Sequence, residues 1–139
     1  MKNRFVVMVL SVFCLALVPF AVALADGLPP ANAKPLSAIL TTVQQQNTGR
    51  IAEVDFDHGR WEVTMCHARG CQKYYFNPVT GAKEGQRGTD YEQSPSTDSK
   101  SIVTIVKRVE AAKIGIVTDI DFDHGHWKVE LVIPQSNAR

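Results

Sequence analysis

The sequence predicts an α+β fold: two helix-plus-antiparallel-hairpin repeats, with the helices packed on one face of an antiparallel sheet of about five strands. Two similar ten-residue segments, 54–63 and 120–129, are identical at seven positions and lie 66 residues apart. Each follows a segment with helical period, and each alternates apolar and polar residues as half-buried strands do. The repeated order of helix and hairpin therefore indicates one helix-plus-hairpin unit present twice, and it leaves open whether the two copies share one sheet.

The first 25 residues have the composition of a secretory signal peptide. Two basic residues precede an almost wholly apolar stretch, Phe5 to Leu24, which ends in the small-residue pattern Ala23-Leu24-Ala25. This arrangement predicts cleavage after Ala25 and a periplasmic or secreted protein, with no stable membrane insertion after cleavage. The alternative is a retained membrane anchor, because about 20 apolar residues can span a bilayer. Residues 26–35 form a Pro-rich lead-in.

The charge of the chain argues against a nucleic-acid partner. Removal of residues 1–25 takes away two of the 15 basic residues and no acidic one, so the formal net charge changes from +1 to 13 − 14 = −1. A chain this close to neutral lacks the basic surface that binding to nucleic acid or to anionic lipid requires.

Each repeat begins with a predicted helix, which starts near Leu36 in the first repeat and near Ile102 in the second. The apolar residues lie at i, i+3, i+4 and i+7, which is one stripe of a helix. They are Leu36, Ile39, Leu40 and Val43 in the first repeat and Ile102, Ile105, Val106 and Val109 in the second. We expect Pro35 near the start of the first helix, and Gly49 and Gly115 to end the two helices.

A predicted hairpin with a two-residue turn follows each helix, at His58-Gly59 and at His124-Gly125. Glycine supplies the positive φ that such a turn needs, and histidine tolerates it. The turns set the register, and in this register the apolar side chains share one face. The predicted pairs are Phe56–Trp61, Val54–Val63 and Ala52–Met65, then Phe122–Trp127, Ile120–Val129 and Thr118–Leu131. The predicted core therefore contains Phe56, Trp61, Val63, Phe122, Trp127 and Val129.

Cys66 and Cys71 remain once the signal peptide is removed, and an even pair in an exported protein favours a disulfide. The cysteines flank a four-residue loop and are predicted to be cross-strand neighbours on the face away from the core. Residues 84–98 are polar and poor in aliphatic side chains, which is typical of a linker between repeats. The second repeat, 99–139, is truncated and lacks the cysteine hairpin.

The first repeat resembles the PepSY domain family. The resemblance rests on the order of its parts over residues 36–83: a helix, a glycine, an alternating strand, a tight turn, a Trp-x-Val strand, an aromatic strand and the turn Asn77-Pro78-Val79-Thr80-Gly81. The family's usual turn has Asp where this chain has Asn77 and continues with a glutamate-like position, whereas Ala82 and Lys83 follow here. The resemblance implies a helix packed on an antiparallel sheet, and a role in holding or inhibiting a peptidase outside the cytoplasm.

Together these features predict an exported, non-enzymatic protein-binding module that needs no cofactor and inhibits or modulates a secreted or periplasmic peptidase. The chain lacks a phosphate-binding loop and a zinc-protease helix motif, and no nucleophile has an evident base and orienting group. The expected contact residues are His67, Arg69 and Tyr75, the last as an exposed aromatic side chain.

The alternative function is metal binding or metal sensing through the two Asp-x-Asp-His-Gly turns. Carboxylate and imidazole groups are suitable ligands for transition metals, and the candidates are Asp57, His58, Asp123, His124 and His126. A structural interpretation competes with this one, because the same residues can form cross-strand charge pairs and make the turns.

Overall fold

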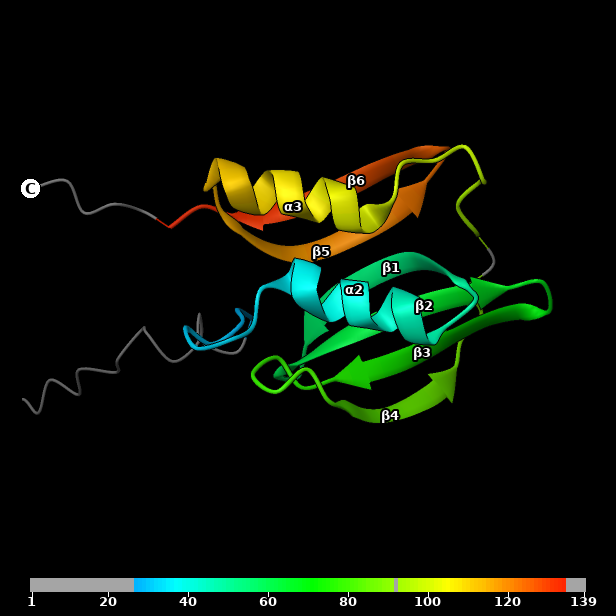
Figure 1. Ribbon diagram of the computed structural model, residues 1–139, viewed down its shortest axis with the longest axis horizontal. Helices are drawn as coiled ribbons and strands as arrows, with labels where there is room; N and C mark the ends of the chain where they lie inside the picture. The colour runs from blue at the N-terminus through cyan, green and yellow to red at the C-terminus, as the bar shows by residue number, and fades with distance from the viewer. Residues whose placement is uncertain (1–26, 92, 135–139) are drawn as a thin grey trace, which may run out of the picture.

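The computed structural model describes residues 27–91 and 93–134 (Figure 1). The described chain is α+β, with two helices and a six-stranded antiparallel sheet. The elements are α2 (Leu36–Gln46), β1 (Arg50–Asp57), β2 (Arg60–His67), β3 (Gly70–Phe76), β4 (Lys83–Gly88), α3 (Ile102–Ala112), β5 (Ile116–Asp123) and β6 (His126–Val132). The predicted signal peptide, 1–25, lies outside the described residues. Within them, no helix has the length and apolar character needed to cross a membrane.

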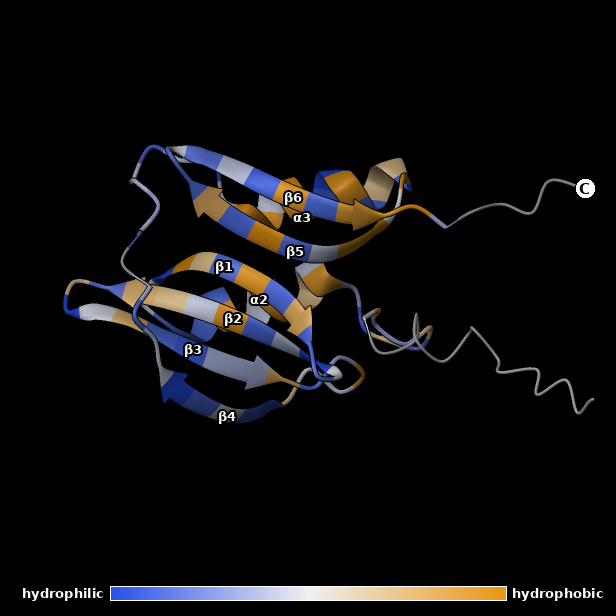
Figure 2. Ribbon diagram, turned by 180° about the vertical axis from the view of Figure 1, so that it is seen from behind, coloured by the Kyte–Doolittle hydropathy of each residue, from blue (hydrophilic) through white to orange (hydrophobic). Residues whose placement is uncertain are grey.

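The strands follow the order β4-β3-β2-β1-β5-β6, so that β4 and β6 are the two edges. The central pair, β1 and β5, joins the two hairpins with Val54 opposite Ile120. One hydrophobic core contains side chains from α2, α3 and the sheet. We call the face of the sheet that carries Val54, Trp61 and Val63 the inner face, and the opposite one the outer face. Figure 2 shows the resulting alternation of hydrophobic and hydrophilic residues along β1 and β5.

Both predicted two-residue turns are confirmed. His58 and Gly59 have φ values of 51° and 75°, and His124 and Gly125 have 48° and 80°, as a type I′ turn requires. Phe56 therefore pairs with Trp61, and Phe122 pairs with Trp127. In both pairs the rings meet edge to face, with centroids 5.0 Å apart.

The register prediction is wrong at the far end of each hairpin, because each first strand contains a β-bulge. Met65 lies opposite Ile51 rather than Ala52, and Leu131 lies opposite Val117 rather than Thr118. The extra residue in the strand shifts the pairing by one. As a result the larger side chains, Ile51 and Val117, face the core, and both are buried.

Four of the six predicted core residues are buried, namely Phe56, Trp61, Val63 and Phe122. Trp127 and Val129 on β6 are only half-buried and pack against the margin of the core. The two helices contact each other, and the carboxylate of Glu110 on α3 accepts hydrogen bonds from the backbone N–H (3.0 Å) and hydroxyl (2.5 Å) of Ser37 in the first turn of α2. A carboxylate at this position also interacts favourably with the helix dipole.

Gly49 and Gly115 do not end the helices, contrary to the prediction. The helices end earlier, at Gln46 and Ala112, and Lys113 takes the left-handed conformation after α3 with φ of 51°. The two glycines instead allow neighbouring strands to approach closely. A Cβ atom added at Gly49 would lie 2.9 Å from the carbonyl oxygen of Cys66, and one at Gly115 would lie 2.9 Å from that of Val132.

Strand β4 lies almost wholly in the segment 84–98, which the sequence predicts to be a linker. Its residues, Lys83–Gly88, are poor strand formers, and all but one are exposed. Pairing with β3 therefore accounts for the strand, with Tyr74 opposite Gln86 and Tyr75 opposite Gly85. The linker is thus partly sheet, and the sheet has one more strand than predicted.

Candidate functional site

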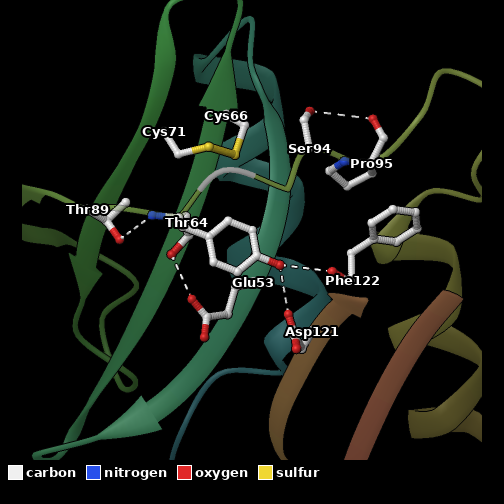
Figure 3. The surroundings of a disulfide bond; sticks show 10 residues. Glu53, Thr64, Cys66, Cys71, Thr89, Ser94, Pro95, Asp121 and Phe122 are labelled. Carbon is white, nitrogen blue, oxygen red and sulfur yellow. Dashed lines mark hydrogen bonds between the residues drawn. A yellow bond between two sulfur atoms is a disulfide. The ribbon is translucent and has the colours of Figure 1, made fainter. Parts of the chain in front are cut away.

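The β2–β3 hairpin ends in a disulfide-closed tip. Cys66 and Cys71 lie directly opposite each other and form the predicted disulfide, with their Cα atoms 3.9 Å apart (Figure 3). The connection is shorter than predicted, because His67 pairs with Gly70 and only Ala68 and Arg69 form the loop. The tip is therefore held by the backbone pair His67–Gly70 and by the disulfide at the next pair of residues along the hairpin.

The side chains at the tip form an exposed basic group beside an open hollow. His67, Arg69 and the loop backbone are exposed, while Arg50 from β1 is half-buried and donates from Nη1 to the carbonyl oxygen of Pro95 at 3.1 Å. The hollow has a volume of about 620 Å³. It is lined by Thr48, Gly49, Arg50, Cys66, His67, Ala68, Arg69 and Ser94. The structure thus brings two predicted contact residues together and adds Arg50 to them.

The imidazole of His67 lies beside Gly49. A Cβ atom at position 49 would lie 2.6 Å from Cε1 and 2.8 Å from Nδ1 of His67, closer than real Cβ atoms approach. The imidazole therefore lies close to the backbone of Gly49, while the residue as a whole remains exposed to solvent or a partner.

Tyr75 is not the exposed contact residue that the sequence predicts. It lies on the outer face but is only 7% exposed. The guanidinium of Arg60 stacks over its ring, 3.7 Å from the centroid, and the neighbouring strand β4 passes beside it at Gly85. Since a cation over an aromatic face is itself a favourable contact, Tyr75 contributes to packing of the outer face.

The first histidine turn offers three potential metal ligands. One donor atom from each of Asp57, His58 and Glu62 lies within 4.8 Å of the others. His58 Nδ1 lies 2.9 Å from Asp57 Oδ2, and both side chains are at least half exposed. The second turn repeats only part of this arrangement. His124 Nδ1 lies 2.7 Å from Asp123 Oδ1, but Lys128 occupies the position that matches Glu62.

The two histidine turns cannot share one metal ion, because they lie at opposite ends of the sheet. His58 follows Val54 by four residues, and His124 follows Ile120 by four residues on the antiparallel strand. At about 3.3 Å per residue, the turns are roughly 26 Å apart. The exposed His126 lies beside the second turn and is equally remote from the first.

A ladder of carboxylates crosses the outer face where β1 meets β5. Glu53 lies directly opposite Asp121, and Asp55 lies directly opposite Asp119. Burial, followed by the charges of Asp55 and Glu130, raises the pKa of Asp119 to about 6. Burial and the neighbouring carboxylates of Asp57 and Glu62 also raise the pKa of Asp55. Like charges that face each other across a sheet are destabilising.

Tyr91, in the predicted linker, covers one end of this ladder. Its hydroxyl lies 2.8 Å from Asp121 Oδ1 and 2.9 Å from the carbonyl oxygen of Phe122, and it can donate to either. Burial and the hydrogen bond with Asp121 raise the pKa of Tyr91, so the hydroxyl keeps its proton. Neither Tyr91 nor the ladder was predicted. The alternating acids of 53–57 and 119–123 were visible, but the pairing of β1 with β5 was not.

Comparisons with protein-family models, curated proteins and solved structures gave no match to this chain. The resemblance to PepSY domains therefore stays a prediction from the residues. The turn that contributes to it, Asn77–Gly81, folds around the side chain of Asn77, whose Oδ1 accepts hydrogen bonds from the backbone of Val79 (2.9 Å) and Thr80 (3.0 Å).

Proposed function

We propose that this protein is an exported, non-enzymatic binding module that contacts a secreted or periplasmic polypeptide, a peptidase in the case that the PepSY resemblance favours. The observation that carries the proposal is the disulfide-closed tip. It presents two side chains to solvent beside Arg50: His67 at the end of β2 and Arg69 in the two-residue loop. A loop fixed before binding loses little conformational entropy when a partner docks, which improves affinity.

A cross-linked capture experiment tests this function. The oxidised protein is the bait, the extracellular or periplasmic proteins of the source cell are the prey, and mass spectrometry identifies what is bound. The test variant is His67→Ala/Arg69→Ala. The matched control is Lys107→Ala/Arg108→Ala, which removes two exposed basic side chains from α3.

We expect one partner to be captured by the original protein and by the α3 control but lost with the tip variant. If that partner is a peptidase, its activity should change when the module is added. Equal capture by both variants, or no saturable complex with the folded protein, would contradict the proposal.

Metal binding is the second candidate, favoured by the three donor atoms of Asp57, His58 and Glu62. Calorimetric titration with Zn²⁺ or Cu²⁺ tests it. Because the second turn has lysine in place of Glu62, His124→Ala is the matched control for His58→Ala. We expect binding to weaken at least tenfold in His58→Ala and to be unchanged in His124→Ala. Heats that are equal in the two variants, or absent in all three proteins, would exclude the site.

We also propose that the chain consists of two related halves, 36–83 and 99–139, with both helices on one face of the sheet. Three observations support this arrangement. The turns match, the bulges at Ala52 and Thr118 are 66 residues apart, and Val54 pairs with its own counterpart, Ile120. Antiparallel pairing of equivalent residues is what a local two-fold axis produces, and Figures 1 and 2 are consistent with it.

A further inference from the structure

We infer that β6 is the contact surface for a second copy of this chain, which joins through antiparallel β6–β6′ pairing centred on Val129. This inference concerns a surface distinct from the hairpin tip and goes beyond the proposed function. Strand β6 is one of the two edges of the sheet, and no strand among residues 27–91 and 93–134 pairs with its free side (Figures 1 and 2).

The other half of the molecule shows what β6 lacks. Strand β2 carries Trp61, Val63 and Met65 toward the core, and each is at most 2% exposed. Strand β3 covers them, with Phe76 opposite Trp61 and Tyr74 opposite Val63. The matching residues of β6 have no such neighbour on their free side in the described chain, and all three are half-buried: Trp127, Val129 and Leu131. A strand added to β6 would complete their burial.

The backbone of β6 is oriented for such pairing. In a hairpin with a two-residue turn, the turn's own hydrogen bond joins the flanking residues, here Asp123 and His126. Bonded and non-bonded pairs then alternate along an antiparallel ladder. Trp127 and Val129 therefore belong to non-bonded pairs with β5, and they direct their N–H and C=O groups to the free edge.

The charges of β6 select a second copy as the occupant. Exposed edge strands are commonly protected by charged side chains, and the outer face of β6 carries one of each sign, Lys128 and Glu130. With Val129 opposite Val129′, each Lys128 lies opposite Glu130′ of the other copy. Trp127 lies opposite Leu131′ on the inner face. Centring on Lys128 or Glu130 would place like charges opposite each other, whereas centring on Val129 pairs all seven residues of the strand.

The ion pair within one chain, Lys128 Nζ to Glu130 Oε1 at 3.1 Å, is exposed and easily exchanged for its counterpart across the interface. In the proposed register the Lys128–Glu130′ pairs are non-bonded backbone pairs, whose side chains lie closest. The two-fold symmetry produces two Lys128–Glu130′ pairs, so one substitution in the sequence changes both of them. Because a pair of seven-residue strands buries less area than a standard interface, we expect a dissociation constant on the order of micromolar.

Sedimentation of charge-reversed variants tests the inference. The purified protein is examined over concentrations of about 1 to 500 μM, around the expected dissociation constant. Lys128→Glu and Glu130→Lys each create two like-charge pairs, and each should weaken dimerisation at least tenfold. The double reversal restores opposite pairs and should restore the dimer. A mixture of the two single variants should form the heterodimer. One variant then carries two acidic side chains at positions 128 and 130 and the other carries two basic ones, so opposite charges meet only between unlike copies.

The matched control is Arg87→Glu on the other edge strand, β4, which should dimerise like the original protein. Far-UV circular dichroism establishes that each variant is folded. A monomer at every concentration would overturn the inference and leave β6 free for a strand of another protein. A dimer that both single reversals leave intact, or single variants that fail to associate with each other, would equally overturn it.

Discussion

Replacing Asp119 with asparagine is predicted to stabilise the protein at neutral pH and to leave it unchanged at pH 4. Asp119 faces Asp55 on one side and Glu130 on the other, and its pKa is about 6 instead of 3.8. One carboxylate oxygen, Oδ1, is buried and has no hydrogen-bond partner within the described residues. A neutral amide at this position removes the repulsion from Asp55 and Glu130, and Oδ1 has no hydrogen bond to lose within the described residues.

The sign of the pH dependence follows from the raised pKa. A carboxyl group whose pKa is higher in the folded protein contributes stability below its unfolded-state pKa. That contribution is lost as the pH rises through the folded-state value. The window is therefore pH 3.8 to about 6 for Asp119. Asp55, whose pKa is raised as well, acts in the same direction.

The magnitude can be worked out from the same pKa. A shift of about two units corresponds to ~3 kcal/mol at about 1.4 kcal/mol per unit. Since Asp119 is only half-buried, solvent screening reduces this to about 1 kcal/mol. For a domain of this size, that free energy raises the melting temperature by about 4 °C.

Thermal unfolding followed by circular dichroism at pH 4 and pH 7 measures the effect. Comparing Asp119→Asn with the original protein at each pH cancels the contributions of the carboxylates that do not contact Asp119. Asp98→Asn, in the exposed connecting segment, is the matched control and should change neither melting temperature. An Asp119→Asn variant that is no more stable at pH 7, or equally stabilised at both pH values, would refute the reasoning.

Three further predictions concern packing. Gly49→Ala places a methyl group 2.6 Å from His67 and should lower the free energy of unfolding in urea by about 1–2 kcal/mol. Gly88→Ala, with open space around it, is the control and should not lower it. Equal losses in the two variants would contradict a close contact between Gly49 and His67. Trp61→Ala should lower the free energy of unfolding by about 3–5 kcal/mol, and Trp127→Ala should lower it by less than half as much. Similar losses in the two variants would contradict the half-buried position of Trp127 on β6. Replacing both disulfide cysteines with serine should cost about 2 kcal/mol for so small a loop under oxidising conditions, and no loss in guanidinium unfolding would argue against a stabilising role.

The hairpins could be predicted because their signals are local. A His-Gly pair with positive φ fixes the turn, and alternation of apolar residues fixes which face is buried, so the pairing of Phe56 with Trp61 follows from ten residues. The bulges could not be predicted, since Ala52 and Ile51 are both apolar. Only the three-dimensional core decides that the larger one faces inward while both are buried.

The candidate site was predictable only in part. His67 and Arg69 could be predicted to lie together, because the spacing of Cys66 and Cys71 indicates a hairpin with these residues at its tip. Arg50 joins them through the pairing of β1 with β2, which carries Arg50 opposite Cys66. The burial of Tyr75 could not be predicted, because the groups that cover it come from elsewhere: Arg60 at the start of β2, and strand β4, which has no strand-forming residues of its own. Contacts between segments far apart in the chain cannot be predicted from a local sequence pattern.

The segment that connects the halves is attached to the sheet near both of its ends. Tyr91 and Pro95 attach its beginning to β5 and β1, and the carbonyl oxygen of Lys100 accepts a hydrogen bond from Trp127 Nε1 at 3.1 Å. A protease that cuts at the exposed residues between these points, 96–98, therefore leaves every contact of the β1–β5 seam intact. We expect the two fragments to stay together as a nicked complex, and separately produced halves to reassemble by fragment complementation.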